Sequence, residues 1–392
     1  MQTTLKLYDT DSHLTACEAT VLCCGYDEAF QAYTIILDQT VFFPEGGGQL
    51  ADVGFINDIE IFDVQIKEDV IVHYTTENIL DKLIPGTAVT CKINWSRRFD
   101  FMQQHSAEHI LSGLVHRTYG YQNVGFHLGL TETTLDFDGP LTVPQIEELE
   151  TAANEAVYRN IDFHITFPDA DTLASLEYRS KKELSGDVRI VTLPGYDICA
   201  CCAPHVYRTG EIGTIKIVSF MTHRGGMRLT ILCGKRALKD YQTKQNSVEQ
   251  ISALLSAKQP EVAAAVAKTK TDQQTLILRI NALQKMVLDA ELRSLPAPDI
   301  TENVLLFQKD LDTKAIRDAV NELCTRYTGY CGIFNGDPDT GYTYVLGSST
   351  KDCRQAAASL REAFHAKGGG SAKMIQGNVI ADEKSIRTLL DI

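Results

Sequence analysis

Two pairs of metal-ligand residues, far apart in the chain, constrain the fold more than any other feature. His105 and His109 lie in the segment FMQQHSAEHILSGL, and Cys201 and His205 lie in ICACCAPHVYRTGEIG. Each pair has i, i+4 spacing, which lets two side chains bind one ion together. If all four residues hold the same ion, the fold must bring two distant segments into one cleft.

The chemistry of these four residues favours zinc, because one thiolate and three imidazoles are too soft a set for magnesium or calcium. The apolar spacing around the histidine pair predicts an amphipathic helix with both imidazoles on one face. Pro204 and its small neighbours predict a turn that leads into a strand over 212–218. Cys199 and Cys202 stay open as spare thiols or as substitutes for Cys201.

Charge argues against a general nucleic-acid binder. Lys and Arg total 37 against 51 Asp and Glu, a formal net charge of -14, whereas affinity for nucleic acid rests on neutralised phosphates. Local basic faces remain open, although a run of charge is more often a solvated surface than a phosphate track. The candidates are Arg97 and Arg98, then Arg179, Lys181, Lys182 and Arg189, and finally Lys351, Arg354, Arg361, Lys367 and Lys373.

The chain is expected to be cytoplasmic. Its N-terminus has no basic segment followed by an apolar run, and no stretch approaches the length of a membrane span. Eleven cysteines include the adjacent pairs Cys23-Cys24 and Cys201-Cys202. Adjacent cysteines suit a disulfide framework poorly and are typical of a reducing compartment.

The sequence predicts an α+β protein of several domains. Short β-rich runs with Gly, Pro, Asn and Asp turns predict a small N-terminal β-barrel over 1–92. Alternating helices and strands over 93–235 predict an α+β domain that holds both ligand pairs. A helix is expected from Val143 to Asn160, with Thr142 as its cap and Pro144 in its first turn.

Helices dominate 236–300, where a heptad seam runs from Val262 to Ala290. This segment predicts either an antiparallel helical hairpin or a coiled coil that dimerises, with equal weight. The region 301–392 returns to α/β patterning and contains a second glycine-rich loop around KGGGSAKMIQG. The first such loop, FFPEGGGQLADVG, lies in the N-terminal domain and is either a flexible hairpin or a functional loop.

Together, these motifs resemble the editing half of alanyl-tRNA synthetase, in the same order along the chain. They are HSAEH, the CxxxH followed by VYRTGEIGTIKIVS, FFPEGGGQLADVG and GGGSAKMIQG. No aminoacylation core precedes the barrel, so the chain is similar to free-standing alanyl-tRNA editing proteins of the long type. Those proteins keep the helical segment and the Gly-rich C-terminal domain.

The resemblance implies a zinc-dependent, ATP-independent hydrolase that serves translation fidelity. Its zinc would be held by His105, His109, Cys201 and His205, and no catalytic residue beyond the metal centre is assigned. Aligning on Gly125 places Asn123 where the family carries a polar residue proposed to sense a serine hydroxyl. Gly47, Gly48 and Gln49 are expected beside it in substrate binding. Gly368, Gly369, Gly370 and Lys373 are expected to contact tRNA.

Two departures from the family pattern bear on the substrate pocket. The family often has Cys-Gly-Gly-Thr-His where this chain has Cys201, Cys202, Ala203, Pro204 and His205. The ligand spacing survives, but the two glycines and the threonine hydroxyl do not. In the glycine loop, Phe43 stands where the family has tyrosine, and Gly46 stands where it has serine or glycine. Both are mild changes.

The implied reaction is hydrolysis of the ester between an amino acid and tRNA(Ala), with serine as the preferred error and glycine as a slower one. Zinc would either supply hydroxide from a bound water or hold the substrate amino group while another water attacks. Two alternatives are a zinc hydrolase of small esters or amides on this scaffold, and a non-catalytic tRNA-binding protein with structural zinc. A homodimer through the helical or C-terminal region is also expected.

Overall fold

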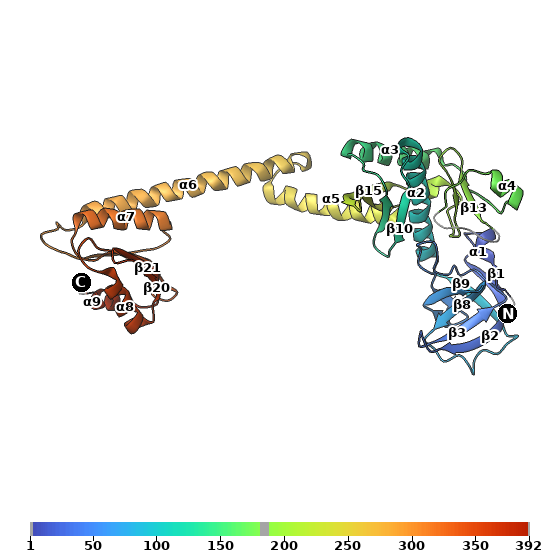
Figure 1. Ribbon diagram of the computed structural model, residues 1–392, viewed down its shortest axis with the longest axis horizontal. Helices are drawn as coiled ribbons and strands as arrows, with labels where there is room; N and C mark the ends of the chain where they lie inside the picture. The colour runs from blue at the N-terminus through green and yellow to red at the C-terminus, as the bar shows by residue number, and fades with distance from the viewer. Residues whose placement is uncertain (1–2, 181–187, 391–392) are drawn as a thin grey trace. The chain divides into compact units, whose positions relative to one another are not determined.

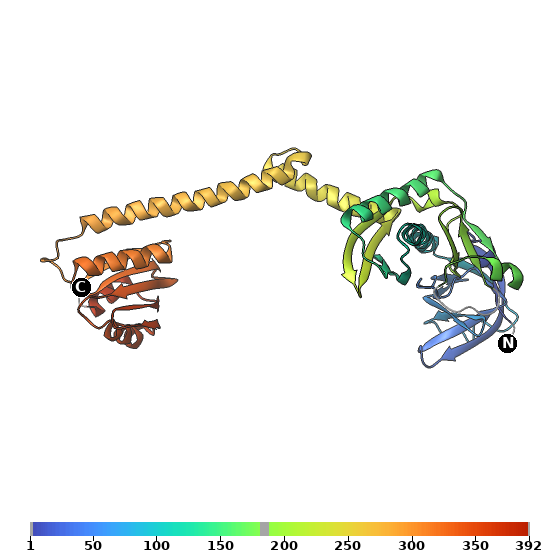
Figure 2. The same cartoon turned by 45° about the horizontal axis from the view of Figure 1, so that its top comes forward.

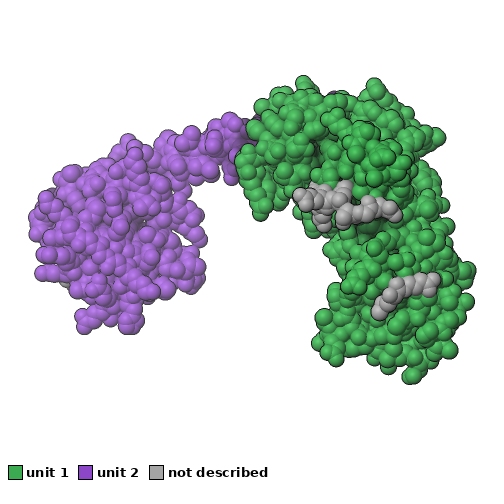
Figure 3. All heavy atoms as spheres, turned by 45° about the vertical axis from the view of Figure 1, so that its right-hand side comes forward, with its two compact units in different colours: residues 1–248 green, residues 249–392 purple. Residues whose placement is uncertain are grey.

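The computed structural model describes residues 3–180 and 188–390 and divides into two compact units, 1–248 and 249–392 (Figure 3). The elements of the first unit run from the N-terminal strands to the helix α5 (Figure 1). Those of the second unit run from the end of α5 to α9. Both units mix helices and strands, which confirms the expected α+β class.

The N-terminal strands form one antiparallel sheet of seven strands in the order β6-β5-β9-β2-β3-β8-β7. The bounds are β2 Ala16–Asp27, β3 Ala32–Leu37, β5 Gly54–Ile56, β6 Ile59–Ile61, β7 Asp63–Lys67, β8 Val70–Thr75 and β9 Ala88–Ile93. Two short strands, β1 Leu5–Lys6 and β4 Gln39–Thr40, pair beside α1 Leu7–Thr10.

The predicted closed β-barrel is wrong. The sheet curls, because the Phe62 N–H after β6 donates to the Tyr74 carbonyl of β8 at 3.1 Å. No ladder joins the edge strands β6 and β7 among the described residues, and both strands are short. A strand of three residues, as β6 is, offers too few backbone groups to close a barrel.

The helix α2, Trp95–Tyr119, forms the centre of the module that follows. The Asn94 side chain accepts a hydrogen bond from the Arg97 N–H at the first turn, and Gly120 ends the helix in a left-handed conformation, φ 75°. Figure 2 shows α2 nearly end-on, with strands on several sides of it. Every residue from Phe101 to Val115 is buried, so the helix is enclosed rather than amphipathic.

Two antiparallel sheets and one long helix surround α2. A four-stranded sheet has the order β10-β11-β16-β15, and a three-stranded sheet has the order β12-β13-β14. Helix α3 spans Val143–Arg159 with Thr142 as its cap and Pro144 in its first turn, as expected, and Thr142 forms a capping box with Gln145. The other bounds are β10 Asn123–Leu128, β11 Thr133–Phe137, β12 His164–Thr166, α4 Ala170–Ser175, β13 Ile190–Leu193, β14 Asp197–Ala200, η1 Thr209–Ile212, β15 Ile215–His223 and β16 Gly226–Cys233.

Helices α5, Lys235–Leu255, and α6, Val262–Ser294, flank the short helix η2, Gln259–Glu261. The central seam side chains of α6 are exposed rather than covered as a hairpin would require, with Leu276 at 58% and Val287 at 65%. Only its last turns pack into a core, through Leu288 and Leu292. Dimerisation along the seam therefore stays a prediction.

The C-terminal domain carries a five-stranded sheet in the order β17-β18-β19-β21-β20, of which only β17 and β18 are parallel. The elements are β17 Val304–Gln308, α7 Thr313–Arg326, β18 Cys331–Asp337, β19 Gly341–Gly347, α8 Cys353–Phe364, β20 Lys367–Gly370, β21 Met374–Val379 and α9 Glu383–Leu389. The prediction of a loop over the second glycine-rich segment is therefore partly wrong. Gly368, Gly369 and Gly370 form the exposed edge strand β20, paired with β21.

A buried ion pair joins the N-terminal sheet module to α2. Arg98 and Asp52 are 0% and 1% exposed at their side chains, and the Arg98 Nε donates to both Asp52 oxygens at 3.1 and 3.0 Å. Arg98 also donates to the carbonyls of Ser12 and Val41, at 3.0 and 2.6 Å. The guanidinium is thus held by three separate N-terminal segments.

We expect Asp52→Ala to lower the free energy of unfolding of this unit by about 3 to 5 kcal/mol, because it leaves a buried guanidinium without its counter-charge. Trp95 is the chain's one tryptophan and reports urea unfolding of this unit by fluorescence. Glu77→Ala, which removes an exposed partner of Lys82, is the control and should cost at most about 1 kcal/mol. Equal losses in both variants would contradict the role of the buried pair.

Candidate metal centre

The fold brings the two ligand pairs together. His105 and His109 project from α2, and Cys201 and His205 come from the segment after β14. One ligand atom of each residue lies within 4.8 Å of all the others. The Cys201 Sγ is 3.6 Å from the Nε2 of His105 and 3.4 Å from the Nε2 of His205. All four residues are candidates for one tetrahedral ion, as the spacing predicts.

Each histidine is oriented by a hydrogen bond at Nδ1, on the side away from the cluster. The partners are the Gln49 Oε1 at 3.0 Å from His105, the Asp197 Oδ2 at 2.8 Å from His109 and the Ser106 Oγ at 3.2 Å from His205. An outer partner of this kind fixes a metal-ligating imidazole and its tautomer. The three Nε2 atoms are thereby left for an ion, which fits a zinc centre.

Strong mutual electrostatics are built into the cluster. Burial raises the pKa of the Cys201 thiol, but the neighbouring charges of His105 and His205 outweigh it and hold that pKa well below the usual range. Burial lowers the pKa of His109, yet the hydrogen bonds to Asp197 and Cys201 raise it to about 10. For His205, burial and the charge of His109 lower the pKa to about 3. A thiolate is therefore ready to bind a cation.

The neighbouring thiols differ from Cys201. Burial raises the pKa of Cys199, and its sulfur groups with His109 and Asp197 rather than with the four-residue cluster. Burial also raises the pKa of Cys202, to about 11. Its Sγ lies 3.5 Å from the position that a Cβ on Gly47 would take. The geometry thus favours Cys201 over Cys202 as the sulfur ligand.

The first glycine loop reaches the metal cluster. A Cβ on Gly48 would lie 2.9 Å from the Phe126 carbonyl oxygen, so only glycine allows this approach to β10. The Gly48 carbonyl accepts a hydrogen bond from the Leu128 N–H at 3.0 Å. This contact brings Gln49, which is 1% exposed, against His105. The Gln49 Nε2 is buried and has no hydrogen-bond partner among the described residues.

Asn123 lies beside the cluster but is largely engaged by its neighbours. Its Nδ2 donates to the Glu108 Oε1 at 2.6 Å and to the Ser112 Oγ at 2.8 Å, and its Oδ1 accepts from the Gly125 N–H at 3.1 Å. The second Glu108 oxygen is 3.7 Å from the His109 Nε2. Glu108 therefore belongs to the candidate site.

Several of the basic candidates act inside the structure. Arg179 donates to both oxygens of Asp197 at 2.7 Å, and Arg189 donates to the carbonyls of Cys201 and Ala203 at 2.7 and 2.9 Å. Arg179 thus holds the carboxylate that binds His109, and Arg189 holds the backbone that carries Cys201. Lys181 and Lys182 lie outside the described residues.

The basic candidates near the C-terminus lie in the second unit. Lys351 donates to the Asn303 side chain at 3.2 Å, and Arg354 pairs with Asp352. Arg361 donates to the Gly368 carbonyl at 3.2 Å. The expected tRNA contacts of Gly368, Gly369, Gly370 and Lys373 stay predictions.

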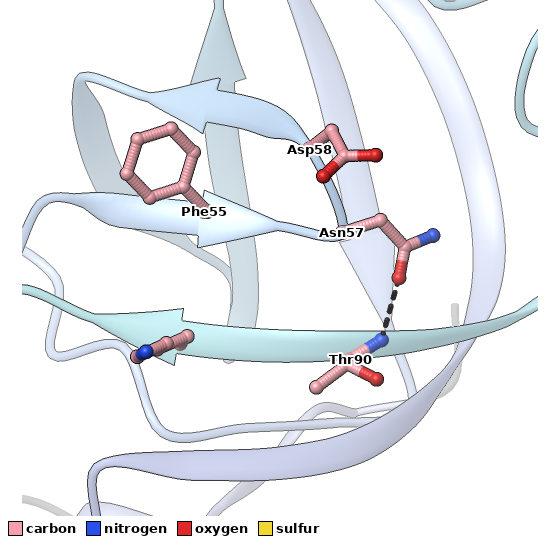
Figure 4. Close-up of a pocket in the computed structure, with 5 residues that line it drawn as sticks. Phe55, Asn57, Asp58 and Thr90 are labelled. Carbon is pink, nitrogen blue, oxygen red and sulfur yellow. Dashed lines mark hydrogen bonds between the residues drawn. The ribbon is translucent and has the colours of Figure 1, made fainter.

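A hollow of about 310 Å³ on the N-terminal sheet is a different feature. Phe55, Asn57, Asp58, Thr90 and Lys92 line it (Figure 4). The Asn57 Oδ1 accepts a hydrogen bond from the Thr90 N–H at 2.9 Å, as Figure 4 shows. The lining contains neither histidine nor cysteine, so this hollow is not the metal centre.

The main residues that sequence reasoning missed are the supports of the ligands. Asp197 follows a glycine turn, and Ser106 lies inside HSAEH, but nothing in their spacing marks them as partners of histidines. Only the return of β14 to α2 brings Asp197 against His109. Glu108 carried one available signal, since it is a carboxylate between two ligand histidines.

Two segments of the chain are similar to domain families of the aminoacyl-tRNA synthetases. Residues 188–229 match the family described as the threonyl and alanyl tRNA synthetase second additional domain. Residues 15–97 match the class II (A) tRNA synthetase family. The first match includes Cys201 and His205, and the second covers much of the N-terminal sheet.

Relatives confirm the resemblance that the motifs indicated. The chain is 28% identical to the alanyl-tRNA editing protein Aarsd1-B of Xenopus laevis, over 93% of this chain and 90% of the relative. It is 27% identical to the mouse alanyl-tRNA editing protein Aarsd1, over 90% and 86%. It is 30% identical to the alanine–tRNA ligase of Methanobrevibacter smithii, where the match covers 76% of this chain but 34% of the ligase. The chain thus resembles the alanyl-tRNA editing proteins over nearly its whole length.

None of the helices in the described parts of the chain has the length and apolar character needed to cross a membrane.

We expect purified protein to contain about one zinc per chain, and Cys201→Ser and His109→Ala to lose it, because each removes one of four ligands. Cys202→Ser is the matched control, since it changes the adjacent thiol and should keep the metal. Elemental analysis measures the metal content. Metal retained in Cys201→Ser and lost in Cys202→Ser would reassign the sulfur ligand.

We expect Asp197→Asn to weaken zinc affinity by about 10- to 100-fold, because the amide orients His109 less firmly than the carboxylate does. Competition with a chelator of known affinity measures the change. Asp162→Asn removes an exposed carboxylate paired with Arg208 and should leave the affinity unchanged. An unaltered affinity in Asp197→Asn would show that the outer hydrogen bond has no part in metal binding.

Proposed function

We propose that this protein is a zinc-dependent editing hydrolase that removes serine, and more slowly glycine, from tRNA(Ala). The observation that supports it most is the four-residue cluster, in which three oriented imidazoles and a thiolate converge in a domain of the editing type. The names of the full-length relatives agree with alanyl-tRNA editing. The geometry also supports a metal-assisted reaction more than a structural zinc, because its ligands come from two distant segments and not from a Cys-rich knuckle.

The chemical demand is modest, because the ester between an amino acid and a ribose hydroxyl is already activated. A site needs to position water at the carbonyl carbon and to stabilise the negative charge that develops on the carbonyl oxygen. Bound zinc would supply a Lewis acid, held by His105, His109, Cys201 and His205. Beside these ligands, the buried Gln49 Nε2 is a donor without a partner in the described parts of the chain. We assign it to the substrate, with Gly47 and Gly48 as the backbone that lines the same side.

The need for serine removal follows from pocket physics. A pocket that accepts alanine rejects serine only weakly, by about 100-fold, and has no means to exclude the smaller glycine. A second site that hydrogen-bonds the serine hydroxyl distinguishes the two, because alanine leaves that group unpaired. The Asn123 Oδ1 accepts one hydrogen bond, from Gly125, and an amide oxygen has two lone pairs. We assign the second lone pair to the serine hydroxyl.

Substrate selectivity tests the proposed function. Single-turnover hydrolysis is compared for tRNA(Ala) charged with serine, glycine or alanine, with a small amino acid ester as a fourth substrate. We expect the order serine, glycine, alanine, with the small ester slowest. Faster turnover of the small ester would favour a small-molecule hydrolase, and tRNA binding without any hydrolysis would favour a non-catalytic role.

We expect Asn123→Ala to reduce the preference for serine over alanine by roughly fivefold, which corresponds to about 1 kcal/mol for one hydrogen bond. Zinc content should not change. Ser112→Ala is the control, because it removes the other Glu108 donor and leaves the Asn123 oxygen in place. If both variants lose the same selectivity, Asn123 acts only through Glu108, and the assignment to the hydroxyl is wrong.

A further inference from the structure

A cationic pocket lies at the N-terminal end of α2, outside the metal cluster. It has a volume of about 450 Å³, and the side chains that set its character are Arg97, Asp100, Leu130, Lys235, Arg236 and Lys239. Four of these six residues are cations and one is a carboxylate. Such a concentration of positive charge is unusual in a chain with a net charge of -14.

One of the four cations is neutralised within the pocket. Arg236 pairs with Asp100 through three hydrogen bonds of 2.7 to 3.0 Å and donates to the Gly129 carbonyl at 2.9 Å. This pair joins α5 to α2 and to the turn after β10. It therefore fixes the shape of the pocket and leaves the other three cations uncompensated.

The remaining cations have no carboxylate partner within residues 3–180 and 188–390. Arg97 donates its Nε to the Ala51 carbonyl at 3.1 Å and lies 4.7 Å from the centre of the Phe101 ring, contacts that hold it without neutralising it. Lys235 and Lys239 are exposed, and neither ammonium has an ion-pair partner in residues 3–180 and 188–390. Their i, i+4 spacing puts both on one face of α5.

The backbone adds to the positive electrostatic potential of the pocket. Asn94 and Ser96, in the first turn of α2, also line the pocket, and Lys235 opens α5. Two long helices thus begin at this pocket, and helix N-termini carry partial positive charge that favours anions.

The position relates this pocket to the candidate active site. Arg97 and His105 lie on the same helix, and the rise between them is about 12 Å. Leu128, the last residue of the strand β10, pairs with Gln49 of the glycine loop, and Leu130, two residues later, lines the pocket. A chain whose terminal ester lies at the cluster would carry its nearest backbone phosphates toward the pocket.

We propose that this pocket binds backbone phosphates near the 3′ end of the tRNA. The proposal rests on the proposed function for the identity of the polyanion. The pocket's own chemistry requires only a phosphate, so a free phosphate compound is the competing source.

The test measures equilibrium binding of an uncharged acceptor minihelix that ends in the tRNA(Ala) 3′ strand, so that hydrolysis plays no part in the readout. Lys235→Gln and Lys239→Gln should each raise the Kd on the order of tenfold at low salt and reduce the slope of log Kd against log salt by about 0.7. Lys244→Gln is the matched control. It removes one charge from the same helix, where Lys244 pairs with Asp240 outside the pocket, and should have a far smaller effect.

A neutral methylphosphonate at each of the last few minihelix linkages locates the contact. At the linkage that Lys239 contacts, the neutral methylphosphonate should raise the Kd of the unaltered protein. It should not raise the Kd of Lys239→Gln any further, because that contact is already lost. Lys239→Arg, which keeps the charge, should respond to the methylphosphonate as the unaltered protein does. Equal changes in Kd for the pocket variants and for Lys244→Gln would overturn the proposal. So would methylphosphonate effects at every linkage that simply add to the effect of Lys239→Gln. So would lysine-dependent competition by inorganic phosphate that leaves minihelix affinity unchanged.

The two proposals fail separately. A protein that binds the minihelix through these lysines but hydrolyses no charged tRNA would keep the pocket and lose the proposed function. A protein that hydrolyses seryl-tRNA(Ala) with the same KM in Lys235→Gln, Lys239→Gln and Lys244→Gln would keep the function and lose the pocket.

Discussion

The buried ion pair between Arg98 and Asp52 is the interaction on which the candidate site depends. Two charges out of water are costly unless they are paired and fully hydrogen-bonded. Here the guanidinium also binds two N-terminal carbonyls, those of Ser12 and Val41. Because Arg98 is on the histidine helix, the pair locks the N-terminal sheet to the first turns of α2.

Because of this ion pair, the N-terminal module supplies contacts to a candidate metal centre whose four ligand residues all lie in the second module. The Ser12 hydroxyl donates to the His205 carbonyl at 2.7 Å, and Gln49 orients His105 from the glycine loop. Each contact crosses from the N-terminal module to a ligand. An N-terminal sheet that undocked would therefore remove the hydrogen bonds to the His105 imidazole and to the His205 carbonyl. The His109–Asp197 and His205–Ser106 hydrogen bonds would remain within the second module.

The same arrangement separates chemistry from substrate capture. The cluster is small and almost entirely buried, whereas the cationic pocket at the start of α2 and α5 is open. One helix carries both, with the ligands in its middle and the phosphate-binding candidate at its N-terminal end. Under the proposed function, a long polyanion with a reactive terminus would suit this layout, because binding energy gained at the pocket would position the ester at the metal.

Sequence alone predicted that His105, His109, Cys201 and His205 would come together, because both pairs follow the spacing that chelation requires. It also predicted the capped helix α3, whose signals are local. It could not predict that the middle of α2 is enclosed on all sides, since the buried Gln104 binds the backbone of Cys233, far along the chain, as well as the nearby Asp100. The open sheet in place of a barrel, and the strand β20 in place of a loop, depend likewise on long-range pairing.

The central claim is that the four-residue cluster, once loaded with zinc, carries the ester hydrolysis. The most direct measurement is the single-turnover rate of seryl-tRNA(Ala) hydrolysis by metal-stripped protein, before and after one equivalent of zinc is restored. The account predicts that stripping reduces the rate by at least about 100-fold, that zinc restores it, and that His109→Ala stays inactive with zinc present. A rate that is unchanged by stripping in a folded protein would contradict it.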